Sequence, residues 1–172
     1  YHHTLRENVK YTNNVSFIDT YELCTNNHGF KSQCNQITDK NYDFAFIGDS
    51  FTEGTPIEYE DSFVGIFDEK TQYKTANLGI VSYSPKIYLS KVNYLIQQGF
   101  NFNHVVVFID ISDLYDDTNF YSIDQNLKVT EKYSEKKNLK RRKFLRNNFP
   151  LTNFYMFVIK KYKLTNNNVK ME

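Results

Sequence analysis

The chain has 172 residues, enough for one domain with a hydrophobic core of its own. Its net charge of +1 argues against a dedicated nucleic-acid-binding protein, and no apolar run reaches the roughly 18 residues that a membrane-spanning helix needs. The chain begins with Tyr1 rather than Met, and no basic segment followed by an apolar one opens it. We therefore expect a trimmed N-terminus, and the loss of a signal or an anchor stays open.

The segment Tyr1–Lys40 predicts an irregular N-terminal lead-in, because polar residues dominate it and a helical period is absent. Short strands are expected at Val15–Ile18 and Tyr21–Cys24. The adjacent His2 and His3 have no third ligand nearby in the sequence. They could be a tag remnant or a metal pair, but we expect surface residues rather than a metal pair.

The stretch from Asp43 to Gly54 carries the clearest chemical signal. An apolar run, Phe44–Ile47, breaks at Gly48 and is followed by Asp49 and Ser50. This pattern predicts a buried strand that ends in a tight turn and lifts a serine off the carboxyl end of a sheet, where open α/β sheets place their sites. The alternative is a strand followed by an ordinary helix N-cap, a role that both Asp and Ser fill.

Helices and strands are expected to alternate after this turn. We predict a helix over Tyr59–Lys70, a strand over Tyr73–Ile80, a helix from the Ser82–Pro85 segment to Gly99, and a strand over Asn103–Ile111. The residues expected on the buried faces of the two helices are Phe63, Val64, Ile66, Phe67, Ile87, Tyr88, Leu89, Val92, Tyr94, Leu95 and Ile96.

The strand over Asn103–Ile111 is an unbroken apolar run, so we expect both of its faces to be covered, as in a parallel sheet between helices. Strands that alternate with helices predict a doubly wound α/β fold. The expected architecture is a three-layer α/β/α sandwich around a parallel, flavodoxin-like sheet in residues 41–164.

The C-terminal third predicts a long polar loop over Asp116–Lys137 and a basic helical tail over residues 138–164, with a disordered end over residues 165–172. A cluster of basic residues beside the apolar segment Phe154–Ile159 suits a membrane surface, an anionic glycan or a nucleic acid. We favour a solvated helix face that packs on the sheet through its aromatic side chains. The basic residues are Lys136, Lys137, Lys140, Arg141, Arg142, Lys143 and Arg146.

Three stretches, in their order and spacing, resemble the conserved blocks of the SGNH (GDSL-type) hydrolase family. Ile47–Gly54 (IGDSFTEG) resembles the first block, Tyr73–Ile80 the second, and Asp110–Leu114 the third. In the third block Ser112 stands where the family usually shows Asn, and Asp113 matches its Asp. The resemblance covers Thr25 to Asp117, and the family's last block, an Asp and a His a few residues apart, has no counterpart in this chain.

The resemblance implies an SGNH fold and a serine esterase or O-acyltransferase that acts on acylated carbohydrate or another ester, without a metal or organic cofactor. Ser50 would attack the ester carbonyl, and the backbone N–H groups of Ser50 and Gly79, with the side chain of Ser112, would hold the oxyanion. Asp49 would order the turn rather than act as the base. The residues in supporting roles would be Gly48, Asp49 and Asp113.

The resemblance also implies a location and partners. Thr25–Lys31 is similar to a segment of an extracytoplasmic branch of the family, with Lys31 where Arg is usual. We expect a periplasmic or cell-surface protein, with a cytoplasmic one as the alternative. Its partners would be a small-molecule or glycan ester and, for a transferase, a membrane acyl donor, but no nucleic acid. Cys24 and Cys34 are then expected to form a disulfide, the alternative being two reduced thiols in a cytosolic protein.

The catalytic base is not identified in the sequence. A serine nucleophile needs a base within hydrogen-bond reach, yet His104 is expected roughly 20 Å away, at the start of its strand. His28 would reach the site only if the lead-in folded over it. We expect the Asp and His, with one or two more strands, beyond Glu172. The alternatives are a catalytically inactive domain of the same fold that binds a glycan or a protein, and a membrane-associated module that uses the basic tail.

Overall fold

A computed structural model of the chain describes residues 3–13 and 20–132. Their helices and strands belong to one compact unit, Tyr1–Glu131, while a second unit, Lys132–Glu172, lies almost wholly outside the described residues. The predicted strand Val15–Ile18, the basic tail over residues 138–164 and the predicted disorder over residues 165–172 also lie outside them.

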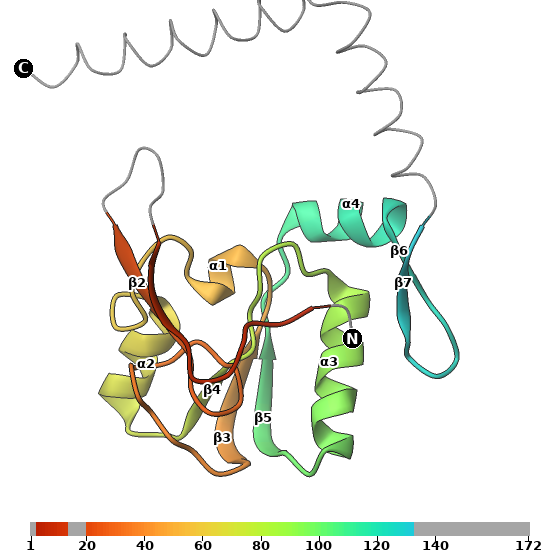
Figure 1. Cartoon of the computed structure of the whole chain (residues 1–172). Coiled ribbons are helices and arrows are strands. Elements are labelled where there is room, and N and C mark those ends of the chain that lie inside the picture. Colours follow the sequence, from red (N-terminus) through yellow and green to blue (C-terminus); the bar gives the residue numbers. More distant parts are fainter. Residues whose placement is uncertain (1–2, 14–19, 133–172) are drawn as a thin grey trace, which may run out of the picture. The chain divides into compact units, whose positions relative to one another are not determined.

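A three-stranded parallel sheet forms the centre of the compact unit (Figure 1). Its middle strand β3 (Asn41–Ile47) pairs with β4 (Thr75–Asn77) on one side and with β5 (Asn101–Val107) on the other. Helix α2 (Phe63–Thr71) connects β3 to β4, and helix α3 (Pro85–Gln97) connects β4 to β5. The protein is therefore a mixed α/β protein with a parallel sheet, as the alternation of elements predicted.

The two connecting helices pack on opposite faces of β3. Ala45 and Ile47 lie in one core cluster with Ile87 of α3, whereas Phe46 lies in a second cluster with Val64 of α2. Successive side chains of a strand point to opposite faces of the sheet, so each helix covers the face that its cluster occupies.

Helix α3 begins and ends where the sequence predicted. Ser84 is its N-cap residue, Pro85 opens its first turn, and Gly99 follows it in the left-handed conformation with φ +85°. The predicted buried face is wrong in part: Leu89, Tyr94 and Ile96 of α3, and Phe63 and Ile66 of α2, are exposed. Lys91, by contrast, is fully buried.

The lead-in is more regular than predicted. Strand β1 (Lys10–Asn13) pairs with β2 (Tyr21–Cys24) in an antiparallel hairpin, and Lys31 forms an antiparallel bridge with Asn77 of β4. Tyr21 and Leu23, which alternate along β2, are both buried. The disulfide between Cys24 and Cys34 is formed, with its Cα atoms 4.9 Å apart, which confirms the predicted pairing.

The prediction that β5 is covered on both faces is wrong. Val105 and Val107 are 39% and 49% exposed, and Ile109 beyond the strand is 57% exposed. Among the described strands, β5 pairs with β3 alone, so its outer edge has no partner there. An apolar run records the preference of a segment for burial, but not which other elements lie beside it.

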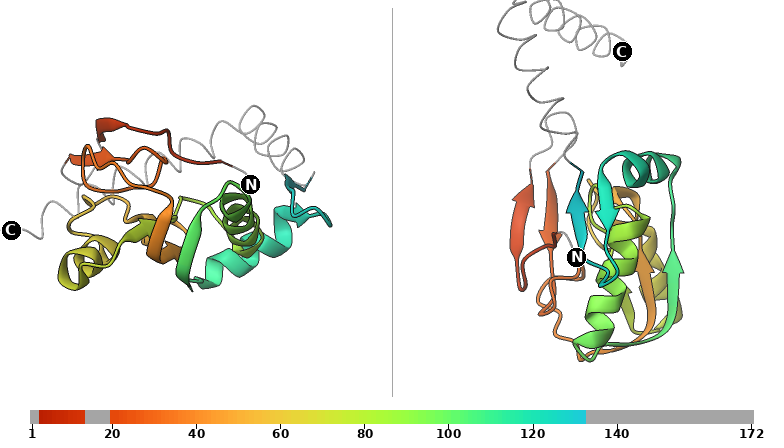
Figure 2. Two further views of the ribbon diagram at one scale, coloured as in Figure 1. Left: turned by 90° about the horizontal axis from the view of Figure 1, so that it is seen from below. Right: turned by 90° about the vertical axis from the view of Figure 1, so that its right-hand side faces the viewer.

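The predicted polar loop after Asp116 is wrong for the part that the structure describes. Helix α4 (Ile111–Asn119) precedes a hairpin of β6 (Tyr121–Ile123) and β7 (Val129–Glu131), which lies beside α3 (Figure 2). The Asp124 carboxylate accepts the N–H groups of Asn126 and Lys128 and so turns the chain between the two strands. Tyr121 and Val129 join the core cluster of α3. Within residues 3–13 and 20–132, every helix is too short or too polar to cross a membrane.

Candidate active site

Ser50 lies where the sequence predicted, in the turn at the carboxyl end of β3. It is the first residue of the short helix α1 (Ser50–Glu53), and it is half-buried. Asp49 is the N-cap residue: its Oδ1 accepts the N–H of Phe51 at 3.0 Å, and its Oδ2 lies 3.5 Å from Ser50 Oγ. The predicted turn and the alternative of a helix cap thus describe one and the same geometry, in which Asp49 orders the backbone around Ser50.

Gly48 brings the ends of the other two strands against this turn. Its carbonyl accepts the N–H of Ile80, which follows β4. A Cβ atom at this position would lie 2.1 Å from Thr52 Oγ1 and 3.1 Å from the carbonyl oxygen of Phe108, which follows β5. The glycine is therefore required for close approach, and the three stretches that resemble SGNH blocks meet at one end of the sheet, where α1 and α4 lie (Figure 1).

Gly79 packs directly on the helix that carries Ser50. A Cβ atom on Gly79 would lie 2.5 Å from the backbone nitrogen of Glu53. The N–H of Gly79 donates to Oδ1 of Asn77 at 3.0 Å, and Nδ2 of Asn77 donates to the carbonyl of Thr52 at 2.9 Å. The structure thus places Gly79 beside α1, with its N–H held by a side chain that the sequence analysis did not single out.

Ser112 and Asp113 lie in the first turn of α4, whose N-cap residue is Asp110. Both the N–H and the hydroxyl of Ser112 donate to Asp110 Oδ1, at 2.7 and 2.5 Å. Asp113 accepts the N–H of Asp110 at 2.8 Å, which completes a capping box. The alternative of a capping role fits this geometry, and the exposed Ser112 hydroxyl is engaged by Asp110.

The end of the sheet is acidic. Asp113 is buried and accepts the Tyr88 hydroxyl at 2.7 Å. Burial raises the pKa of Asp113, and the nearby carboxylates of Asp49 and Asp110 raise it further, against the lowering effect of its hydrogen bonds. Burial and the Asp113 carboxylate also raise the pKa of Tyr88. The sequence placed Tyr88 on a buried helix face but gave no sign of its contact with Asp113.

Two buried charged side chains that the sequence did not predict flank the Gly79 turn. Lys91 of α3 donates to the carbonyl of Leu78 at 3.0 Å, and Glu53 of α1 accepts the N–H of Val81 at 2.7 Å. Burial lowers the pKa of Lys91 to about 7, against the opposing effect of Glu53. Lysine and glutamate are rarely buried, so hydrophobic patterning could not indicate these positions.

His28 and His104 contact residues other than Ser50. His28 lies 3.1 Å from the carbonyl of Thr38 and packs edge-on against Phe100, next to the amino ends of β3 and β5. The lead-in therefore does not fold His28 over the site. His104 stacks on Phe44 and pairs with it in the middle of β5, so the prediction that it lies at the start of its strand is wrong. His3 is exposed, as predicted, and lies 3.0 Å from the carbonyl of Val81.

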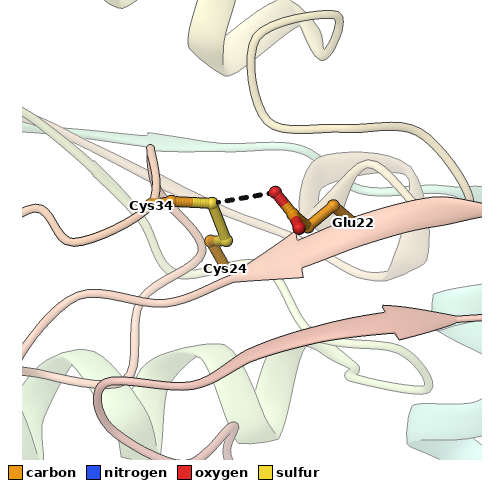
Figure 3. A group of neighbouring side chains, drawn as sticks. All are labelled: Glu22, Cys24 and Cys34. Atoms are coloured by element: carbon orange, nitrogen blue, oxygen red, sulfur yellow. Dashed lines mark hydrogen bonds between the residues drawn. A yellow bond between two sulfur atoms is a disulfide. The ribbon is translucent and has the colours of Figure 1, made fainter.

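One group of potential metal ligands in residues 3–13 and 20–132 consists of Glu22, Cys24 and Cys34, whose ligand atoms lie within 4.8 Å of one another (Figure 3). Both sulfur atoms belong to the disulfide, so neither is a thiolate that could bind a metal ion. A carboxylate oxygen of Glu22 lies 3.3 Å from Cys34 Sγ. The group is a disulfide with a carboxylate beside it.

The chain matches none of the protein-family models, curated proteins or solved structures with which it was compared. The resemblance to SGNH hydrolases therefore rests on the sequence motifs.

Proposed function

We propose that this chain carries the nucleophile and oxyanion elements of an SGNH-type serine esterase or O-acyltransferase, on the core of a three-layer, flavodoxin-like α/β/α sandwich. One observation carries the proposal: Ser50 opens a helix at the carboxyl end of the central strand, packed against the Gly79 turn. Carboxyl ends of parallel strands are where open α/β sheets place their sites.

In the proposed reaction, Ser50 Oγ attacks the carbonyl carbon of an ester. Its proton passes to a base, and the carbonyl oxygen becomes an oxyanion. The N–H of Ser50 lies in the first turn of α1, where N–H groups have no acceptor within the helix. Together with the N–H of Gly79 and the hydroxyl of Ser112 it would hold the oxyanion. The alcohol then leaves, and water or a sugar hydroxyl takes the acyl group from Ser50.

The resting contacts define what substrate binding must change. Oδ1 of Asn77 holds the Gly79 N–H, and Asp110 holds the Ser112 hydroxyl. Both donors would have to turn from these acceptors to the oxyanion. Catalytic hydrogen bonds often become well aligned only in the complex with substrate. The proposal also requires a base within hydrogen-bond reach of Ser50 Oγ.

The proposed substrate is an acylated carbohydrate or another small ester, and a transferase would take its acyl group from a membrane donor. The disulfide supports an extracytoplasmic location, because such bonds persist in oxidising compartments.

A second candidate function is a non-catalytic domain of the same fold that binds a glycan or a protein. Its support is that Asn77 and Asp110 already satisfy two of the three proposed oxyanion donors. In that case the contacts that must rearrange for catalysis would instead be permanent structural bonds.

A fluorophosphonate probe separates the two candidates. The protein in its longest native form should be labelled at Ser50. Ser50→Ala should lose the label, and Ser82→Ala, which changes an exposed loop serine, should keep it. Labelling that survives Ser50→Ala rejects the nucleophile. A folded parent protein that takes no label favours the binding domain. Hydrolysis of a short-chain aryl ester by the same three proteins is the second measurement.

A further inference from the structure

Lys91 is a buried cation next to the proposed oxyanion donor. Its side chain is 1% exposed, its Nζ donates to the carbonyl of Leu78 at 3.0 Å, and it lies 5.0 Å from the centre of the Tyr83 ring. An ammonium group is costly to remove from water unless charges or hydrogen bonds compensate it. The hydrogen bond to Leu78 compensates part of this cost, and a hydrogen bond from a charged donor is stronger than one between neutral groups.

The carbonyl of Leu78 and the N–H of Gly79 belong to the same peptide group. In a trans peptide they point in opposite directions and share one delocalised electron system. A hydrogen-bond chain thus runs from Lys91 through the Leu78–Gly79 peptide to Asn77 and on to the carbonyl of Thr52. Hydrogen bonds in such a chain polarise one another, by about 10–30% per bond.

Glu53 binds the residues that follow Gly79 in the same turn. Its carboxylate accepts the N–H of Val81 at 2.7 Å and the hydroxyl of Thr55 at 3.1 Å. Gly79 also packs on the backbone of Glu53. Helix α3 thus fixes the Gly79 peptide through Leu78, and helix α1 fixes the residues that follow it.

We propose that Lys91 is a positioning residue that orients and polarises the Leu78–Gly79 peptide, and so makes the Gly79 N–H a stronger donor to an anion. The inference rests on the proposed function for its role in catalysis. The carboxylates of Asp49, Asp110 and Asp113 lie at the same end of the sheet and disfavour a developing oxyanion. A buried ammonium behind the donor offsets that repulsion.

Lys31 provides a matched control. It is also 1% exposed, and it also donates to main-chain carbonyls, those of Gly54 at 2.8 Å and Ile57 at 2.6 Å. Its Nζ lies 5.5 Å from the centre of the Tyr21 ring. Lys31→Met therefore removes a buried ammonium near α1 without removing the cation from the Leu78 carbonyl, whereas Lys91→Met removes that cation.

The test follows the Gly79 amide resonance of the isotope-labelled full chain between pH 6 and pH 9. Charged or titratable groups that face Lys91 include Glu53 of α1 and the Tyr83 phenol of the loop before α3. We expect the Gly79 resonance to move as Lys91 loses its proton in the parent and in Lys31→Met. It should stay near its high-pH position in Lys91→Met. A Gly79 resonance that is the same in Lys91→Met and in the parent at pH 6 overturns the proposal.

Kinetics test the same residue independently. Removing a whole oxyanion donor costs about 10²–10³ in rate, so weakening one should lower kcat on an aryl ester about tenfold in Lys91→Met, with KM nearly unchanged. Lys31→Met should keep the parent kcat per folded molecule. Equal losses in the two variants overturn the positioning role.

Two further outcomes keep this test distinct from that of the proposed function. If Lys91→Met does not fold, the parent protein alone provides the test. The pH titrations of the Lys91 Nζ signal and the Gly79 amide signal should then have the same midpoint. Different midpoints overturn the proposal. Failure of the parent to label at Ser50 overturns the esterase function, whereas the Gly79 resonance still decides whether Lys91 polarises the peptide.

Discussion

The two edges of the parallel sheet differ in what surrounds them. At the β4 edge, Thr75, Ala76 and Asn77 are all buried, and the lead-in adds a backbone bridge from Lys31. At the β5 edge, Val105 and Val107 are substantially exposed, although β5 is the more apolar of the two strands. Burial in this protein therefore follows from which elements lie beside a strand, rather than from the hydrophobicity of the strand itself.

The N-terminal lead-in, which covers the β4 edge, is cross-linked by a disulfide. The disulfide between Cys24 and Cys34 closes the segment that contains Thr25 and Lys31, and these two residues are paired in an antiparallel bridge. Lys31 then joins the lead-in to Asn77, next to the Gly79 turn. The site is thus built on the covered edge of the sheet.

Truncation of a buried side chain at the β4 edge should lower the free energy of unfolding more than any other change proposed here. Leu78 follows β4 and is fully buried. Leu78→Ala should lower the free energy of unfolding by about 2–5 kcal/mol, because the lost contacts leave a cavity. Urea denaturation measures the change. A loss under about 1 kcal/mol would mean that the covered side is as loosely packed as the β5 edge.

Removal of the disulfide should cause the second-largest loss in the free energy of unfolding. The double variant Cys24→Ser/Cys34→Ser should lose about 2–4 kcal/mol of unfolding free energy, since the unfolded chain is no longer constrained. Amide hydrogen exchange should increase in β2 and β4 and change little in β5. The parent protein with its disulfide reduced is the matched control. Equal increases in β4 and β5 would contradict a covering that acts on one edge.

Stability should rise with pH above neutrality because of the buried lysines. Burial lowers the pKa of Lys91 from 10.5 to about 7 and that of Lys31 to about 8. Between these values and 10.5 the unfolded chain holds more protons than the folded one, so the free energy of unfolding increases with pH. Above pH 10 the trend should reverse, because Tyr59 and Tyr88 have raised pKa values and ionise first in the unfolded chain.

Urea denaturation at pH 6, 8 and 9.5 checks this prediction. The double variant Lys31→Met/Lys91→Met should show a flatter pH dependence than the parent protein over this range. An equally steep rise in the double variant would assign the effect to other groups.

Substitution at the exposed β5 edge should change the free energy of unfolding least. Val107 is 49% exposed, so Val107→Thr should change the unfolding free energy by less than about 1 kcal/mol. Val64→Thr is the matched control, because Val64 is fully buried and the new hydroxyl would cost about 1–3 kcal/mol without a partner. Equal costs in the two variants would show that β5 is covered in solution.

Local signals predicted much of this fold. Gly48, Asp49 and Ser50 specify a turn because glycine allows close backbone approach and the two polar residues suit a helix start. Pro85 and Gly99 bound α3 for similar reasons. The β6–β7 hairpin was missed although Asp124 supplies a turn signal, because its two strands are only three residues long.

The candidate site was less predictable, because its contacts join residues that are distant in the sequence. Lys91 meets Leu78, and Tyr88 meets Asp113, only after α3 packs on the sheet. Asn77 lies only two residues before Gly79, yet its hold on the Gly79 N–H depends on the backbone angles of the turn. No hydrophobic pattern encodes these three contacts.

The carboxylate of Glu22, 3.3 Å from Cys34 Sγ, also affects how the disulfide can be opened. Reduction begins when a thiolate approaches one sulfur along the S–S axis. Every attacker is thus an anion, and the Glu22 carboxylate repels it more strongly when it carries further negative charge. Lys10, 3.1 Å from the other carboxylate oxygen, offsets part of this repulsion. The rate of reduction should therefore depend on the charge of the reductant, and should be higher for a dithiol whose thiolate is its sole charge than for glutathione, which carries additional net negative charge.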